Sequence, residues 1–144
     1  MNVRSLTGVG RQMCPSRVVL EHVTSRWGVL VLAALLERSY RFSELRREIG
    51  GVSEKMLAQT LRTLERDGFV HRDARPVIPP HVDYSLTALG WEAAELVSGL
   101  GRWAEWRLDE VFSAREKYDE AHQAHDAAPR PDGDPEAYVK ARTS

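Results

Sequence analysis

The chain has 144 residues, of which 42% are hydrophobic and 28% are charged, and its formal net charge at pH 7 is −1. This length suits one domain, and this composition is typical of a globular protein. The small net charge excludes nucleic-acid binding through an overall positive charge, so any basic surface must be local.

Charge and cysteine content narrow the setting. The segment 37–82 has nine Lys and Arg against seven Asp and Glu, whereas the segment 105–144 has six against ten. The single cysteine, Cys14, excludes an internal disulfide, so we expect a cytoplasmic protein. The longest apolar run, Trp27 to Leu36, is too short to span a bilayer, and no apolar stretch follows the N-terminal arginines as in a signal peptide. We therefore expect no membrane association.

Two helices are predicted near the N-terminus, after a flexible arm over residues 1–13. The first helix begins at Pro15, because Val19, Leu20 and Val23 recur on one side of it. The second helix, about 27–38, is almost entirely apolar, which indicates a place in the centre of the core.

The next stretch predicts a helix-turn-helix. Ser43 is expected to cap a short helix that ends at Gly50-Gly51, and Ser53 is expected to cap a second helix that ends at Asp67-Gly68. Two short helices joined by a tight glycine turn are typical of this motif.

A hairpin is predicted directly after the helix-turn-helix. The segments FVHRD (69–73) and HVDYSL (81–86) alternate as strands do, and segment 74–81 between them contains three prolines. Proline limits strand pairing, so the hairpin should have a stiff, extended tip. A helix-turn-helix followed by a hairpin is a winged helix, so we expect a mostly α fold with a small β-hairpin (α+β).

A long helix is predicted from Thr87. Its apolar positions recur at heptad spacing, at Leu89, Ala93, Leu96, Leu100 and Trp103, and Leu108, Val111 and Phe112 continue an apolar face. A small domain has no room to cover this surface alone, so we expect flanking helices that form a homodimer; packing onto its own domain is the alternative. The expected domain covers residues 14–116, and residues 117–144 are expected to be a largely disordered acidic tail.

The helix over 53–67 has the chemistry of a DNA recognition helix. Leu57, Leu61 and Leu64 lie on one side, and the nearly opposite side carries Lys55, Gln59, Arg62 and Arg66. In a major groove, Arg pairs with guanine and Gln with adenine, and Lys and Arg neutralise phosphates. The alternative is a solvated face that only keeps the helix soluble.

Further contacts to double-stranded DNA are expected from the flanking segments. The wing, residues 72–84, should lie on the backbone or the minor groove, where Arg75 would suit narrow A·T-rich DNA. A solvated loop is the alternative for the wing. The expected DNA-binding residues are Arg41, Arg46, Ser53, Lys55, Met56, Gln59, Arg62, Arg66, Arg72, Arg75 and His81.

Cys14 is a candidate redox sensor. It directly precedes Pro15, so it should stand at a helix N-terminus, with Arg11 and Arg17 close in sequence. A helix N-terminus and nearby arginines lower the pKa of a thiol and favour the reactive thiolate. An inert, partly buried cysteine is the alternative.

A small-molecule effector site is a further hypothesis. An apolar cavity at the dimer interface would be lined by Trp27, Trp91, Leu96, Leu100 and Trp103. We expect neither an enzyme, a cofactor nor a metal site, because the sequence has no glycine-rich phosphate loop and no Cys/His cluster with metal-ligand spacing.

Two stretches, RFSELRREIGGVSEKMLAQTLRTLERDGFVHR (41–72) and PPHVDYSLTALG (79–90), resemble the HxlR-type winged helix-turn-helix transcriptional regulators of bacteria. The resemblance runs from about Cys14 to Trp106. It implies a homodimer joined through its N- and C-terminal helices, with residues 53–67 in the major groove. It also implies, for some members, sensing of oxidants or electrophiles through a cysteine that matches Cys14, and for others a response to small molecules.

One departure from the family pattern concerns the second helix. The family often has glycine and lysine before its tryptophan, whereas this chain has Ser25-Arg26 before Trp27. This change lies away from the expected DNA-reading face but bears on the dimer interface or effector cavity.

Three functional hypotheses remain. The protein is a regulator gated by oxidation of Cys14, a regulator with a small-molecule effector and an inert Cys14, or a winged helix that binds only protein.

Overall fold

A computed structural model describes residues 15–127. The chain divides into two compact units, Met1–Trp103 and Ala104–Ser144. The first compact unit therefore ends earlier than the expected domain end at residue 116. The elements are α2 (Pro15–Thr24), α3 (Arg26–Glu37), β1 (Tyr40–Arg41), α4 (Phe42–Ile49), α5 (Glu54–Arg66), β2 (Val70–Arg75), β3 (His81–Leu86), α6 (Ala88–Trp106) and α7 (Leu108–Asp126).

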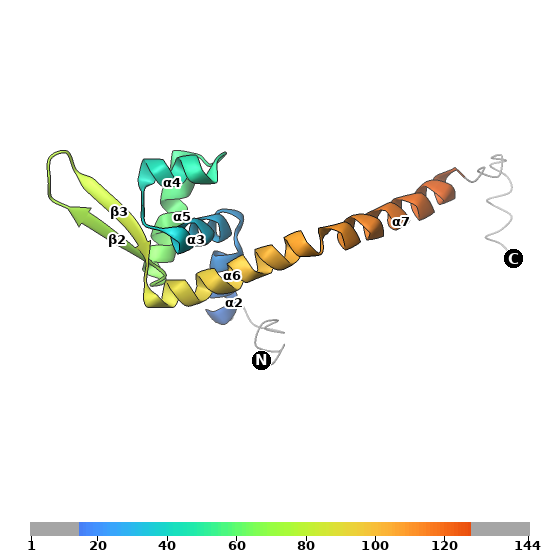
Figure 1. Ribbon diagram of the computed structural model, residues 1–144, viewed down its shortest axis with the longest axis horizontal. Helices are drawn as coiled ribbons and strands as arrows, with labels where there is room; N and C mark the ends of the chain where they lie inside the picture. The colour runs from blue at the N-terminus through green and yellow to red at the C-terminus, as the bar shows by residue number, and fades with distance from the viewer. Residues whose placement is uncertain (1–14, 128–144) are drawn as a thin grey trace, which may run out of the picture. The chain divides into compact units, whose positions relative to one another are not determined.

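The first unit is a winged helix, as the sequence predicts. Its three strands form an antiparallel sheet in the order β1-β3-β2, and the β2–β3 hairpin projects beside α4 and α5 (Figure 1). The pairing of β2 with β3 runs from Val70 opposite Leu86 to Arg75 opposite His81. The mostly α fold with a small hairpin is confirmed.

The core of this unit is built around α3. Val31 and Leu32 are fully buried, and they pack with leucines from the helix-turn-helix, namely Leu45, Leu57, Leu61 and Leu64. The predicted central position of the second helix is therefore confirmed.

Among the described helices, no single one is long and apolar enough to cross a membrane. α2 and α3 taken together reach that length and composition, but a bend of 69° separates them.

The bend between α2 and α3 is tightly packed. Ser25 caps α3, because its Oγ accepts a hydrogen bond of 3.1 Å from the Gly28 N–H and donates one of 2.9 Å to the His22 carbonyl. A Cβ atom on Gly28 would lie 2.3 Å from that carbonyl oxygen. Only glycine fits there, so α2 is held closely against the start of α3.

The helix-turn-helix follows the sequence closely, with one correction. Gly50 and Gly51 make the turn with φ of 69° and 72°, and the Ser53 Oγ caps α5 by accepting from the Met56 N–H at 3.1 Å. The expected cap at Ser43 is wrong, because α4 begins at Phe42 with Arg41 at the N-cap position. Arg41, the last residue of β1, pairs with Asp83 of β3, so the chain passes directly from strand to helix. Ser43 therefore lies inside the first turn of α4.

Strand β1 is absent from the sequence prediction. It has two residues, and its Tyr40 is buried opposite Tyr84 of β3. Two residues carry no readable alternation, so only the sheet itself reveals this strand.

The long C-terminal helix is interrupted and extends further than predicted. α6 begins after Thr87, whose Oγ accepts from the Gly90 N–H at 3.0 Å, and it ends at Trp106. α7 then continues to Asp126 with every residue exposed. The expected disordered tail is therefore wrong for residues 117–126, which are helical. The rest of that tail and the arm over 1–13 lie outside the described residues.

Candidate nucleic-acid interface

The outward face of α5 is polar and open. Leu57, Leu61 and Leu64 are buried on one side of the helix, and Lys55, Gln59, Arg62 and Arg66 are all exposed. At 100° per residue, Lys55, Gln59 and Arg66 stand opposite the leucines, whereas Arg62 stands nearer the side that faces the hairpin. The predicted division of the helix into a core face and a polar face is confirmed.

The basic side chains fall into two groups by their internal contacts. Within the described part of the chain, no hydrogen bond or ion pair engages the side chains of Arg47, Lys55, Arg62, Arg66 or Arg72. Arg41, Arg46 and Arg75 are each bonded to another side chain. Charges in the first group are free to meet an anion without first losing a protein contact.

Arg46 stabilises the turn of the motif. Its Nε donates to the Val52 carbonyl at 3.1 Å, and its guanidinium lies 3.4 Å from the Glu54 carboxylate. A hollow of about 690 Å³ opens beside it, with Ser43 and Ser53 in its wall. Since Arg46 joins α4 to the start of α5, its contacts explain its position without any ligand.

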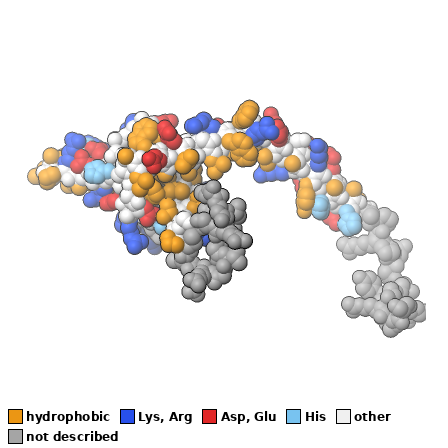
Figure 2. Space-filling view, turned by 90° about the horizontal axis from the view of Figure 1, so that it is seen from below, with side chains coloured by type: hydrophobic (Ala, Val, Ile, Leu, Met, Phe, Trp, Pro, Cys, Tyr) orange, Lys and Arg blue, Asp and Glu red, His pale blue; other side chains and the backbone are white. Residues whose placement is uncertain are grey.

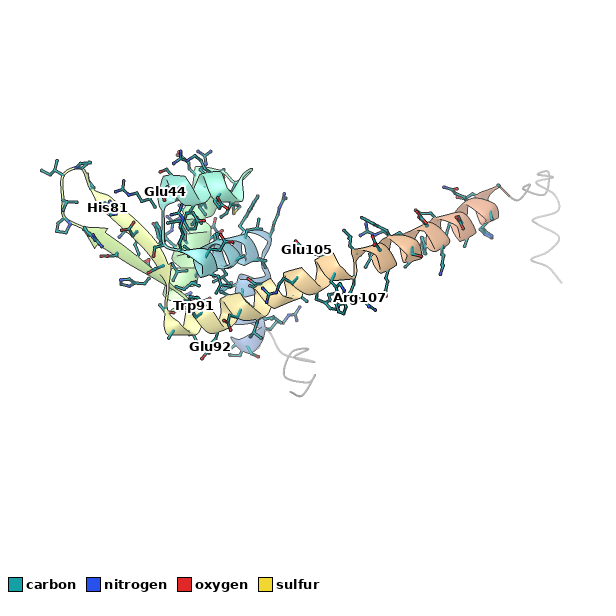
Figure 3. All side chains as sticks on the ribbon, viewed as in Figure 1. Glu44, His81, Trp91, Glu92, Glu105 and Arg107 are labelled. Carbon is teal, nitrogen blue, oxygen red and sulfur yellow. The ribbon has the colours of Figure 1, made fainter. Side chains whose placement is uncertain are left out.

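Arg41 and His81 form a network near the tip of the hairpin. The Arg41 guanidinium donates to His81 Nδ1, and His81 Nε2 lies 2.6 Å from the Asp83 carboxylate. Figure 3 shows His81 on the hairpin. The network fixes both side chains that were expected to contact DNA.

A groove separates α5 from the hairpin. It has a volume of about 410 Å³, and Arg62 and Glu65 of α5 face Arg72 and Tyr84 of the hairpin across it. Two exposed arginines without internal partners therefore line one groove from opposite sides. Arginine side chains suit either a phosphate or a guanine edge, and the Glu65 carboxylate stands in the same groove.

Met56 and Gln59 face a different neighbour. With Thr60 and Thr63 they line a small hollow of about 140 Å³ against His22 and Ser25, at the bend between α2 and α3. Met56 is 42% exposed. The polar face of α5 is thus bordered by the hairpin on one side and by α2 on the other.

The sequence analysis did not predict the contact that connects α2 to the end of α5. His22 Nδ1 lies 2.5 Å from the Asp67 carboxylate at the C-terminal end of α5. The two residues are 45 positions apart, and no local pattern pairs them.

The Arg38–Glu44 pair stiffens the start of α4. The Arg38 guanidinium donates to the Glu44 carboxylate at 3.1 Å and lies over the Tyr40 ring, 3.8 Å from its centroid. The hydrogen bond from Arg38 is the main cause that lowers the pKa of Glu44 below its ordinary value of 4.5, and the attraction between the charges adds to it. Figure 3 shows Glu44 on α4.

The effector cavity expected at the dimer interface stays a prediction, and within one chain the five residues expected to line it have different surroundings. Leu96 is 76% exposed, and the cavity that it lines, of about 600 Å³, has Leu36, Glu92, Glu95 and Arg102 as its other walls. Trp27 is half-buried on α3 beneath the Arg26 guanidinium, 4.6 Å from its ring centroid. Trp91 stands on a different side of α6 from Leu96, by the helical period.

An exposed apolar stripe runs along α6. At 100° per residue, Leu89, Leu96, Leu100 and Trp103 fall on one side, and each is at least half exposed. In the space-filling view, hydrophobic side chains gather on the side of the core where α6 lies (Figure 2). Of the predicted stripe, Ala93 packs against the core, and the other four residues are uncovered within the described part of the chain.

Cys14 lies outside the described residues, but its neighbour in sequence is placed. Pro15 is the first described residue and lies in α2. The described residues contain no group of three or more His, Cys, Asp or Glu side chains arranged to hold a metal ion.

Comparison with known proteins gives a consistent family assignment. The model of the HxlR-like helix-turn-helix family matches residues 22–112. The uncharacterised HTH-type transcriptional regulator YtfH of Escherichia coli (strain K12) is 61% identical over 106 residues, which are 74% of this chain and 84% of that protein.

Solved structures agree with this assignment. A protein assigned as the transcriptional regulator YtfH of Salmonella typhimurium superimposes with a TM-score of 0.70 and 56% identity, over 75% of this chain and 96% of that one. The reduced form of the redox regulator HypR superimposes with a TM-score of 0.64 and 32% identity, over 69% of this chain and 98% of that one.

Proposed function

Because the chain belongs to the HxlR-like helix-turn-helix family, whose relatives here are transcriptional regulators, we propose that it binds specific DNA sites as a homodimer. The recognition helix, residues 53–67, enters the major groove, and the wing, residues 72–84, lies along the backbone or the minor groove. The observation that carries the proposal is the exposed polar face of α5 opposite its buried leucines.

The geometry favours a division of labour among the exposed side chains. Lys55, Gln59 and Arg66 stand on the side of α5 away from the core and are suited to base edges. Arg62 and Arg72 line the groove between helix and hairpin, so they are suited to the phosphates of the strand that would run through it.

The stripe on α6 supports the proposed dimer. Leu96, Leu100 and Trp103 are 76%, 59% and 55% exposed, and apolar stripes of this kind mark protein interfaces. Two-fold dimers read paired half-sites in DNA. Sedimentation equilibrium tests this: L100E should weaken self-association, whereas W91E, on another side of the same helix, should not. Equal association of both variants with that of the wild type would refute this interface.

Thiol gating is the regulatory part of the proposal. Cys14 directly precedes Pro15 in the sequence, and α2, which includes Pro15, is bonded to the end of α5 through His22 and Asp67. Two Cys14 thiols, one from each chain, would form a disulfide and pass two electrons and two protons to an oxidant such as diamide. Similarity to the redox regulator HypR supports this role. A small-molecule effector bound at the α6 interface, with an inert Cys14, is the second candidate, favoured by the exposed apolar stripe.

Fluorescence anisotropy tests the function directly. The probe is a duplex that the wild-type protein selects from a randomised library, offered to reduced and diamide-treated protein at two salt concentrations. Binding that weakens steeply with salt and changes on oxidation, but not in C14S, supports thiol-gated DNA binding. Binding indifferent to diamide refutes the gate and turns the search to ligands of the α6 stripe. Failure to select any duplex refutes DNA binding and favours a winged helix that binds protein.

A further inference from the structure

The tip of the hairpin is apolar and bare. Pairing of β2 with β3 ends at Arg75 opposite His81, which leaves residues 76–80, Pro-Val-Ile-Pro-Pro, as the connection. Ile78 is 101% exposed and Val77 is 51% exposed. Figure 2 shows hydrophobic side chains at the far end of the hairpin. This tip contributes nothing to the core of its own unit.

The tip is also stiff. Three of its five residues are proline, whose ring fixes φ, and the Val77 N–H is bonded to the Arg75 carbonyl at 2.8 Å. A stiff loop loses little conformational entropy when it is ordered against a ligand. The hairpin therefore presents Ile78 as a preformed, narrow apolar point rather than as part of a flat patch.

We propose that Ile78, with Val77 beside it, inserts between base pairs from the minor groove and kinks the bound duplex. This inference rests on the proposed DNA-binding function and adds a mechanical role for the wing. Apolar side chains of this size, including isoleucine, serve as wedges in proteins that bend DNA from the minor groove. The energy of burying the side chain offsets part of the cost of unstacking one base step.

The charges along the hairpin fit a nucleic acid as the occupant of this tip. Asp73 and Asp83 would repel phosphates, but each is bonded to a basic side chain: Asp73 to Arg75 at 3.4 Å and Asp83 to His81 at 2.6 Å. Arg72 is exposed and has no bonded side chain among the described residues. The strands behind the tip thus present one free cation and no free carboxylate to the backbone.

A wedge also predicts where the kink forms. Pyrimidine–purine steps, TA and CA/TG, unstack most easily, so a duplex selected by the wild type should carry such a step under the wing, outside the bases that α5 reads. This preference would arise without any hydrogen bond from the protein to that step.

Substitution of Ile78 tests the wedge without disturbing the fold, because the side chain is exposed. The duplex selected by the wild type carries a fluorophore pair at its ends, for the bend, and 2-aminopurine at the pyrimidine–purine step, for unstacking. We expect I78A to bind about tenfold more weakly, with a smaller bend and without the rise in 2-aminopurine fluorescence. The conservative variant I78L should keep the bend and the fluorescence.

The outcomes distinguish a failure of the Ile78 wedge from a failure of DNA binding. Tight binding by wild type and I78A with the same bend would leave DNA binding standing and overturn the wedge. A loss of self-association in I78A, at unchanged bend, would assign the tip to a second copy of the chain and also overturn it. If the wild type selects no duplex at all, both the DNA-binding function and the wedge fall.

Discussion

His22 Nδ1 and the Asp67 carboxylate are joined at 2.5 Å where α2 meets the C-terminal end of α5, with their side chains 29% and 18% exposed. A carboxylate at a helix C-terminus is disfavoured by the helix dipole, so Asp67 depends on the N–H of His22. We predict that H22A lowers the free energy of unfolding by about 1.5–3 kcal/mol while Asp67 is present, because it leaves that carboxylate without its donor.

Urea unfolding of a double-mutant cycle measures this coupling. The same H22A substitution should cost clearly less in a D67N background, where no charge opposes the dipole. Additive effects of the two substitutions would show that the pair is not coupled.

Gly90 is a second place where packing decides the residue. A Cβ atom there would lie 1.9 Å from the Phe69 carbonyl oxygen, which belongs to the backbone and cannot move aside. G90A should therefore destabilise the fold by about 1–3 kcal/mol through overpacking. G101A, in the same helix with nothing within 4 Å, should instead be neutral or stabilising. Thermal unfolding of both variants compares them, and equal melting temperatures would contradict the close approach.

Substitutions in the two groups of arginines should affect the salt dependence of DNA binding differently. If Arg62 and Arg72 each bind a phosphate, R62A and R72A should each reduce the slope of log affinity against log salt by about 1. R46A, which removes an internal contact, should lower stability and leave that slope unchanged. Anisotropy titrations across a series of KCl concentrations measure the slopes. A loss confined to the selected duplex, absent on a random one, would show instead that Arg62 reads a base.

The Arg38–Glu44 pair gives a pH dependence of known sign. The pKa of Glu44 is lower in the folded chain than its ordinary 4.5, chiefly through the hydrogen bond from Arg38, so the folded state favours the charged carboxylate. This contribution to stability is present above the ordinary value and is lost as the pH falls through the lowered one.

We therefore expect E44Q to melt at a lower temperature than the wild type near pH 7, with a small difference because the pair is solvent-exposed. The difference should close as the pH falls through the lowered pKa of Glu44. E48Q, on the same helix, is the control, because Glu48 has no bonded side chain among the described residues. A difference that persists at low pH would assign the effect to packing.

Local chemistry in the sequence was sufficient for most of the fold. The Gly50-Gly51 turn, the Ser53 cap and the strand over 81–86 depend on neighbouring residues, and each appears where it was predicted. The expected alternation of faces along that strand does not appear, because all six of its residues are partly buried. Ser43 fails as a cap because a long-range pairing, Arg41 with Asp83, occupies the position before α4. Propensity near the helix cannot reveal a strand partner 42 residues away.

The candidate site was predictable only as a set of residue types. Spacing placed Lys55, Gln59 and Arg66 on an outward face, but it could not show that Arg41 would be held by His81. Nor could it show that Arg62 shares a groove with Arg72. These distinctions depend on which side chains meet across the sheet and the helices, which is a property of the tertiary structure.

The close approach of Gly90 to Phe69 connects α6, which carries the proposed dimer stripe, to the end of the recognition helix α5. Thr87 donates its hydroxyl to the Gly68 carbonyl at 2.5 Å, so the start of α6 is joined to the residues that end α5. In the proposed dimer, the distance between the two recognition helices is therefore set by the protein and does not adjust to the DNA. One base pair inserted between half-sites moves them apart by about 3.4 Å and rotates them by about 34°. The regulator should accordingly tolerate many base changes at the centre of its operator, but no change in the number of base pairs there.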